Sequence, residues 1–185
     1  MKTKYIKQEV VYTGTQLHSN YAYTEFDLFG DSIIAFCGKC DIPTEQMADI
    51  EDVKADAKIY SASMLHFIIE HYDTDLEKAV LRQLVLTTIV GEVLHEMCRD
   101  TDITRRGSDL YDGDAKLSIS IATVTPLSSL IHFGINIVSD NTPVKTKGLK
   151  DFDIDPHKFA EQVMTKYKDE HANISKARCK VKWVE

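Results

Sequence analysis

Residues 116–122, KLSISIA, and residues 131–137, IHFGINI, decide the fold, because small or polar residues alternate with aliphatic ones in both. Alternation with a period of two is typical of a β-strand. The Pro-Leu-Ser-Ser segment at 126–129 favours a turn between them. A third stretch, TRRGSDLY at 104–111, precedes them. We therefore expect two or three strands over 105–137, of which 116–124 and 130–138 are the clearest.

More strands are predicted toward both ends of the chain. Residues 5–13 are rich in β-formers and end before a glycine. Residues 23–29 and 32–37 flank the dipeptide Gly30-Asp31, which suits the tight turn of a hairpin. Residues 178–184 alternate between basic and apolar side chains, which predicts a final strand with one basic face.

Three helices are predicted between these strands. Residues 61–72 carry apolar side chains at helical spacing, and residues 76–99 are apolar nearly all round, as in a buried helix. The Asp-Pro pair at 155–156 predicts the start of a helix that ends near residue 172. The acidic segment 41–56 is expected to be a connection with a helical turn around 45–48, and residues 142–155 a polar loop.

These elements predict an α+β fold, in which a mostly antiparallel sheet is combined with about three helices. The chain has 185 residues, 43% of them hydrophobic and 28% charged, which suits one globular domain over residues 1–185. A formal net charge of -7 argues against direct binding of nucleic acid. No apolar run is long enough for a membrane span. The basic start is not followed by the apolar segment that a signal peptide has, so we expect a cytoplasmic protein with reduced cysteines.

Several residues of the central strands suit the binding of an anion. Arg105 and Arg106 could form a bidentate clamp for a carboxylate or phosphate, although neighbouring residues of a strand point to opposite faces. Lys116, His132 and Asn136 could add a cation, an acid and an amide. The alternative is that Arg105 and Lys116 lie in solvent at strand ends, and that His132 only packs.

The same stretches resemble the core of the lipoate and biotin protein ligases. That resemblance implies that Lys116 contacts an activated carboxylate, that Arg106 binds a phosphate or carboxylate, and that Asn136 is the asparagine at a strand end. The ligases have a longer, glycine-rich segment before the lysine, where this chain has only residues 107–115. This departure argues against ATP and a long acyl chain as ligands.

Along nearly its whole length the chain resembles the uncharacterised domain-of-unknown-function family 366. The matching stretches are Gly30-Asp31-Ser32, Gly38-Lys39-Cys40, Asp49-Ile50-Glu51-Asp52, His66, Arg105-Arg106-Gly107, Asp109, Tyr111, residues 116–124, His132-x-Gly134-x-Asn136 and Val181-Lys182-Trp183-Val184. The resemblance implies a ligase-like fold. Because some relatives are linked to 7-deazaguanine metabolism, it also implies that 7-carboxy-7-deazaguanine loses its carboxylate to give 7-deazaguanine.

Such a decarboxylation needs neither metal nor cofactor in principle, because the ring carbon only has to gain a proton as CO₂ leaves. On this hypothesis Lys116 is the first candidate for the proton donor and His132 the second. Asp109 would raise the ground-state energy of the substrate carboxylate, and Arg105 or Arg106 would orient it.

The guanine edge presents N–H donors, which Asp49, Glu51 or Asp52 could accept. Two further residues are candidates for the pocket. Cys40 belongs to an isolated Cys-x-x-Cys pair, which is weak evidence for a metal site, and His66 lies four residues before a glutamate.

Two rival functions stay open at this point. One is an ATP-dependent ligase or acyltransferase of the lipoate or biotin type, and the other is a small-molecule binding protein without turnover. The expected partner is in each case a small molecule, with a heterocyclic carboxylate as the leading choice. A homodimer is also conceivable, since an edge strand invites pairing.

Overall fold

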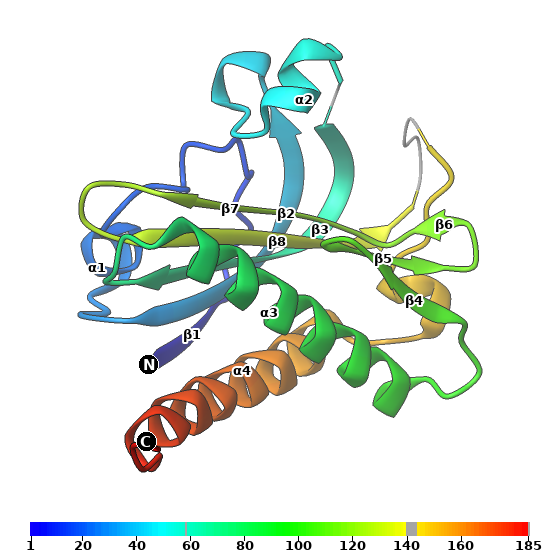
Figure 1. The fold of residues 1–185 in the computed structure, drawn as a ribbon. Helices are drawn as coiled ribbons and strands as arrows, with labels where there is room; N and C mark the ends of the chain where they lie inside the picture. Colours follow the sequence, from blue (N-terminus) through cyan, green and yellow to red (C-terminus); the bar gives the residue numbers. More distant parts are fainter. Residues whose placement is uncertain (58, 140–143, 185) are drawn as a thin grey trace.

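A five-stranded sheet forms the centre of the molecule in the computed structural model, which describes residues 1–57, 59–139 and 144–184 (Figure 1). The strand order is β1-β2-β3-β8-β7; β1 pairs with β2 in parallel and every other pair is antiparallel. The strands are β1 (Lys2–Ile6), β2 (Ser32–Ile42), β3 (Ile59–His71), β7 (Ser118–Val124) and β8 (Ser129–Val138). The predicted α+β class with a mostly antiparallel sheet is confirmed.

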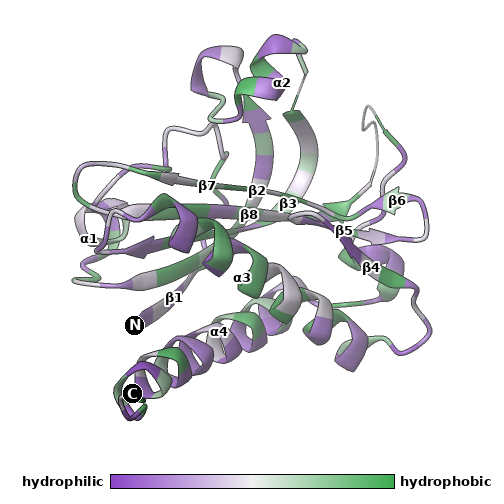
Figure 2. Cartoon of the chain, in the orientation of Figure 1, coloured by the Kyte–Doolittle hydropathy of each residue, from purple (hydrophilic) through white to green (hydrophobic). Residues whose placement is uncertain are grey.

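Two long helices, α3 (Leu76–Met97) and α4 (Pro156–Cys179), cover one face of this sheet (Figure 1). Each begins after an aspartate whose carboxylate accepts a backbone N–H at the helix start: Asp75 from Lys78 and Asp155 from Lys158. Hydrophobic and hydrophilic residues alternate along both helices, as in amphipathic helices that pack on a sheet (Figure 2).

The remaining elements are short. A three-stranded sheet, β4 (Ile103–Arg106), β5 (Asp109–Asp112) and β6 (Ala115–Lys116), links α3 to β7. The short helices are α1 (Tyr21–Phe26), α2 (Ile50–Lys54), and the 3₁₀ turns η1 (Thr44–Gln46) and η2 (Leu149–Phe152). The expected helical turn near 45–48 is thus present as η1, followed by α2.

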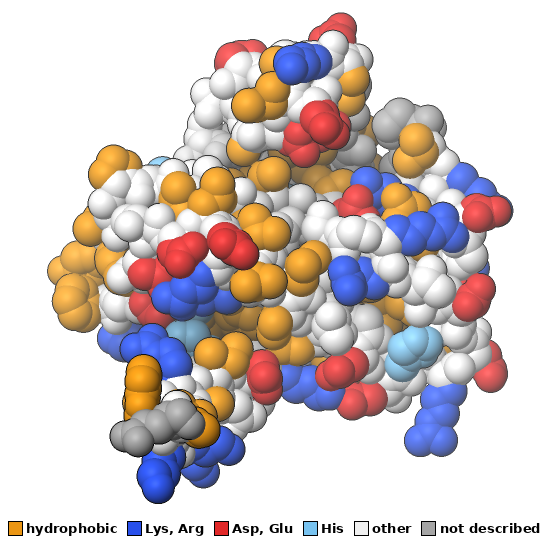
Figure 3. Space-filling model, viewed as in Figure 1, with side chains coloured by type: hydrophobic (Ala, Val, Ile, Leu, Met, Phe, Trp, Pro, Cys, Tyr) orange, Lys and Arg blue, Asp and Glu red, His pale blue; other side chains and the backbone are white. Residues whose placement is uncertain are grey.

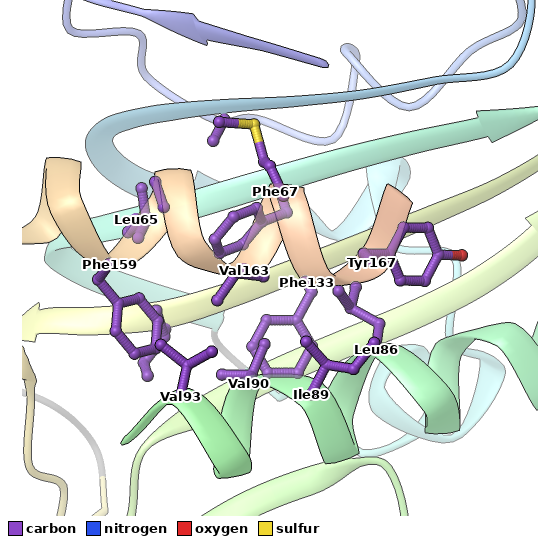
Figure 4. Close-up of a cluster of buried hydrophobic side chains, with 14 of the residues drawn as sticks. Leu65, Phe67, Leu86, Ile89, Val90, Val93, Phe133, Phe159, Val163 and Tyr167 are labelled. Atoms are coloured by element: carbon purple, nitrogen blue, oxygen red, sulfur yellow. The ribbon is translucent and has the colours of Figure 1, made fainter. Parts of the chain in front are cut away.

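The larger hydrophobic core lies between the sheet and the two long helices. Phe67 of β3 and Phe133 of β8 meet Val90 of α3 and Val163 of α4 there, and all four are fully buried (Figure 4). A continuous cluster of this kind is what holds α3 and α4 on the sheet.

A second, smaller core lies on the opposite face, and β2 contributes to both. Cys37 packs against the larger core and Cys40 belongs to the smaller one, across a register shift between Gly38 and Cys40. All four cysteines are free. Gly38 is required at this point, since a Cβ there would stand 1.9 Å from the carbonyl oxygen of Val10.

Three predicted elements are wrong in the first half of the chain. Residues 61–72 belong to strand β3 instead of a helix, because β3 is central and buried on both faces, so its apolar run has no period of two. The first strand covers Lys2–Ile6 and not residues 5–13. Residues 23–29 form no strand, because α1 occupies Tyr21–Phe26 between residues in the left-handed conformation, Asn20 and Asp27.

The second half follows the sequence more closely. The helix at 76–99, the two clearest strands (β7 and β8) and the helix start at Pro156 are confirmed. The stretch around 105–137 holds five strands, β4 to β8, instead of two or three. Helix α3 is less buried than expected, since Leu76, Val80 and Leu81 are exposed. The final strand is wrong: α4 continues to Cys179 and the residues up to Val184 are exposed without regular structure. Of the loop 142–155, the first two residues lie outside the described part, and η2 forms near its end. Among the described residues no helix is long and apolar enough to cross a membrane.

Candidate functional site

A cavity of about 540 Å³ opens on the face of the large sheet that α3 and α4 leave uncovered. Figure 3 shows hydrophobic side chains gathered below the α2 segment, which stands over this face. The volume of the cavity is typical of a small-molecule site. Its polar lining residues are Gln46, Asp49, Asp52, Tyr60, Ser61, Ser108, Asp109, Lys116, Ser118, Ser120, His132, Asn136 and Thr146, and its apolar walls include Tyr12, Leu17, Ile42, Met47, Ile59, Met64, Ile119 and Ile121.

An ion pair lies in the wall that the small sheet contributes. Lys116 Nζ stands 2.7 Å from Asp109 Oδ2, and the side chains are only 29% and 20% exposed. The hairpin of β5 and β6 brings these two residues together. The pKa of Asp109 is raised above its ordinary value, chiefly by burial and further by the nearby carboxylate of Asp52, although the ammonium of Lys116 acts to lower it.

The second carboxylate oxygen of Asp109 has an unusual environment. Asp109 Oδ1 is buried and accepts no hydrogen bond from the residues that the structure describes. A buried carboxylate oxygen without a donor is costly. Because Asp109 lines the cavity, an N–H group of a bound molecule would satisfy this oxygen.

His132 lines the cavity, and a second histidine, the fully buried His66, stacks on it. His132 Nε2 lies 3.0 Å from His66 Nδ1, and His66 Nε2 lies 3.3 Å from the carbonyl oxygen of Gly38. The ring of Tyr12 stacks on His132, with 3.8 Å between centroids. Burial lowers the pKa of His66 to about 3 and that of His132 well below its ordinary value. Both rings are therefore neutral near pH 7, so His132 has no imidazolium proton to donate.

Amide and hydroxyl groups also line the cavity. Ser61 Oγ donates to Asn136 Oδ1 over 3.1 Å. Ser120 Oγ accepts from Gln83 Nε2 over 2.7 Å and donates to the carbonyl oxygen of Ser108. These groups are held by protein partners on more than one side, so they form a rigid polar surface rather than a set of mobile contacts.

The acidic segment 49–52 reaches the cavity with two of its three acids. Asp49 and Asp52 line it, while Glu51 is exposed and outside the lining. Asp49 Oδ1 also accepts the backbone N–H of Glu51 and thereby caps α2. With Asp109, these residues give the lining three carboxylates against the ammonium of Lys116.

The two arginines lie outside the cavity. Arg105 Nη1 donates to the carbonyl oxygen of Gly107, and Arg106 Nη2 donates to that of Gly113. The Arg106 guanidinium also lies 4.6 Å from the ring centroid of Tyr111. Both side chains are exposed on the small sheet, so the expected clamp is not brought to the other candidates.

Apart from Glu51, the other candidates lie together at the cavity. Lys116, Asp109, His132, Asn136, Cys40, Asp49 and Asp52 all line the cavity. His66 contacts it through His132. Burial raises the pKa of Cys40 to about 12, so its thiol is protonated and acts as an apolar wall.

Sequence reasoning missed Tyr12, Ser61 and Met64. Tyr12 lies outside any strand and reaches the site through a bridge to Cys40, for which the sequence carries no signal. The serines of β7 had a signal: Ser118 and Ser120 alternate with aliphatic residues and so share a face of the strand. Within the described residues, the ligand groups close enough to share a metal ion include no residue of the cavity.

Solved structures with a similar fold include protein ligases. The biotin protein ligase of Aquifex aeolicus matches with a TM-score of 0.61 and 14% identity, over 95% of this chain and 71% of that one. A putative lipoate protein ligase of T. acidophilum with bound lipoic acid matches with a TM-score of 0.58 and 14% identity, over 94% of this chain and 87% of that one. The chain thus has the fold of the biotin and lipoate protein ligases.

The family model described as "Domain of unknown function (DUF366)" matches residues 1–182, and the chain belongs to that family. An uncharacterised protein of Methanocaldococcus jannaschii is 34% identical over 183 residues, which are 95% of this chain and 82% of that protein. A solved protein of unknown function from Pyrococcus horikoshi has a TM-score of 0.93 and 35% identity, with all of both chains covered. Sequence resemblance predicted both the family and the fold.

Proposed function

We propose that this protein is a cofactor-independent decarboxylase of a carboxylated deazapurine, with 7-carboxy-7-deazaguanine as the substrate and 7-deazaguanine as the product. The observation that carries the proposal is the Lys116–Asp109 pair, 2.7 Å apart in the cavity wall. It offers a proton donor for the ring carbon, beside a carboxylate that would disfavour the bound substrate anion.

In the proposed step, the substrate carboxylate lies against the ammonium of Lys116 and close to Asp109. Lys116 transfers its proton to the ring carbon that bears the carboxylate. The bond between that carbon and the carboxylate then breaks, its electron pair restores the ring, and CO₂ leaves. Lys116 regains a proton from water. The neighbouring charge of Asp109 disfavours the bound anion and so favours its loss.

The choice of donor follows from the two environments. His132 is buried among aromatic rings and neutral near pH 7, whereas Lys116 is held as an ion pair. We therefore assign the proton to Lys116 and a stacking role to His132. The unpartnered oxygen of Asp109 would accept a ring N–H, and Asp49 or Asp52 would accept N–H groups of the guanine edge.

The test is incubation of the metal-stripped protein with 7-carboxy-7-deazaguanine, followed by mass spectrometry of the base. We expect loss of one CO₂, and in D₂O one deuterium on the ring carbon. Lys116→Met should reduce turnover by about 10²–10⁴-fold. Lys147→Met is the matched control, because Lys147 pairs with Asp112 of the same small sheet but does not line the cavity.

A ligase of lipoate or biotin is the second candidate, and the fold alone favours it. The lining disfavours a triphosphate, since it holds three carboxylates while Arg105 and Arg106 lie elsewhere. If no CO₂ is lost even after divalent metals are restored, the decarboxylase proposal is overturned. Adenylate formed from ATP with lipoate or biotin would then support the ligase, and binding without product a binding protein. The expected homodimer stays a prediction.

A further inference from the structure

A cluster of three side chains lies apart from the cavity, where α4 crosses the end of the large sheet. Asp31 directly precedes β2, His71 is the last residue of β3, and His171 lies on α4. Each offers one ligand atom, and the three atoms all lie within 4.8 Å of one another. We propose that Asp31, His71 and His171 bind a divalent transition-metal ion, with Zn²⁺ as the first choice.

The distances fit a shared ion. Asp31 Oδ2 lies 3.0 Å from His71 Nδ1 and 3.3 Å from His171 Nε2. In a tetrahedral zinc site, metal–ligand bonds of about 2.0–2.2 Å place neighbouring ligand atoms roughly 3.3 Å apart. Both separations are within a few tenths of an ångström of that value. All three ligand atoms lie within 4.8 Å of one another, so side-chain rotations can bring them around one ion.

Each ligand is oriented by a further contact. The other nitrogen of His71, Nε2, lies 3.0 Å from the hydroxyl oxygen of Tyr167, and the other oxygen of Asp31 accepts the backbone N–H of Tyr72 over 3.0 Å. The ring of His171 lies against that of His71, with 5.0 Å between centroids. Outer contacts of this kind fix ring and carboxylate orientation in protein metal sites.

The donor set selects the class of ion. Two imidazoles and one carboxylate suit Zn²⁺, Co²⁺ or Ni²⁺ better than Mg²⁺ or Ca²⁺, which prefer oxygen ligands. His71 is buried, whereas the side chains of Asp31 and His171 are 29% and 24% exposed. A fourth coordination position therefore faces solvent. The neighbouring cation Arg82 is itself held by Asp73 over 2.8 Å.

The place of the cluster indicates what the ion would do. Tyr167 is the last buried residue of α4, His171 lies one turn further, and every residue from Ala172 to Cys179 is exposed. The ion would therefore fasten the final packed turn of α4 to the ends of β2 and β3. This role is independent of the cavity on the opposite face, so failure of either proposal leaves the other standing.

The test uses untagged protein, stripped with a chelator and titrated with Zn²⁺ by calorimetry. We expect one equivalent to bind, and the midpoint of thermal unfolding to rise by about 5–10 °C at an ion concentration near 100 times Kd. Asp31→Asn and His171→Ala should each weaken binding at least about 10-fold. His157→Ala is the matched control, since His157 lies on the same helix and pairs only with Glu161 among the described carboxylates, over 3.6 Å.

A gain-of-signal variant keeps the proposal testable if an alanine variant unfolds. His171→Cys replaces one ligand by a thiolate, so bound Co²⁺ should show a thiolate-to-metal charge-transfer band that the parent protein lacks. Unchanged Zn²⁺ affinity in both His171→Ala and Asp31→Asn would overturn the proposal, as would absence of binding by the parent protein. Loss of binding in His157→Ala would also count against it, since the ion would then lie elsewhere.

Discussion

Replacing Lys116 by methionine tests whether the ion pair in the cavity wall behaves as a desolvated pair. Exposed pairs contribute at most about 1 kcal/mol, and removal of one partner of a fully buried pair costs about 3–5 kcal/mol. The side chains of Lys116 and Asp109 are 29% and 20% exposed at a separation of 2.7 Å. We therefore expect an intermediate loss of about 2 kcal/mol in the free energy of unfolding.

The measurement is urea unfolding of the parent protein, Lys116→Met, Asp109→Asn and the double variant at pH 7. Because each single change leaves an unpaired polar group, the double variant should lose about 1–2 kcal/mol less than the sum of the single losses. The coupling should persist at 1 M NaCl, since partly buried pairs are weakly screened. Single losses that add to within about 0.5 kcal/mol would refute the reasoning.

Two further predictions concern stability. Burial lowers the pKa values of His66 and His132. Below about pH 6.5 the histidines of the unfolded chain take up protons that these buried rings do not. The free energy of unfolding should therefore decrease as the pH is lowered, by up to about 1.4 kcal/mol per pH unit for each ring. We expect the free energy of unfolding, measured with urea in the presence of a chelator, to depend less steeply on pH between 7 and 5 in His66→Gln than in the parent protein. An unchanged pH dependence would contradict this. Gly38→Ala should cost more than about 3 kcal/mol or prevent folding, because its Cβ would meet Val10 O at 1.9 Å. Gly91→Ala in α3 is the control: its Cβ meets only Leu110 at an ordinary 3.5 Å, and thermal unfolding should show a gain of about 0.5–1 kcal/mol.

The sequence predicts an element correctly where the spacing of its apolar residues fits only a helix or only a strand. It fails where the spacing fits both. Helix α3 and strands β7 and β8 carry clear caps, turns or alternation, and the sequence identifies them. Residues 61–72 satisfy the spacing of a helix by chance, because a strand buried on both faces has no polar side to mark its period. The alternation of residues 178–184 has no partner strand in the fold, and alternation alone does not make one.

The residues of the candidate site could be predicted mainly where the resemblance to known families pointed to them. Lys116 and Asp109 are seven positions apart in a hairpin, so their contact could be expected from the sequence. The stack of Tyr12 on His132 depends on a long-range bridge and could not. The arginines fit an anion clamp by residue type, but the hairpin turns them toward solvent, where backbone carbonyls accept their hydrogen bonds.

The hairpin that carries both charges also decides how the site can change shape. Since Asp109 and Lys116 lie on β5 and β6, a rigid displacement of the hairpin preserves their separation and alters only their distance from His132 on β8. Two hydrogen bonds of 2.9 Å resist that displacement, from Leu110 N to Ser118 Oγ and from Lys116 N to the carbonyl oxygen of Lys145. These bonds act together with others, such as those from Thr87 Oγ1 and Ser120 Oγ to the carbonyl oxygen of Ser108. The width of the cavity therefore depends on how the hairpin is attached to its neighbours, separately from the chemistry of the charges.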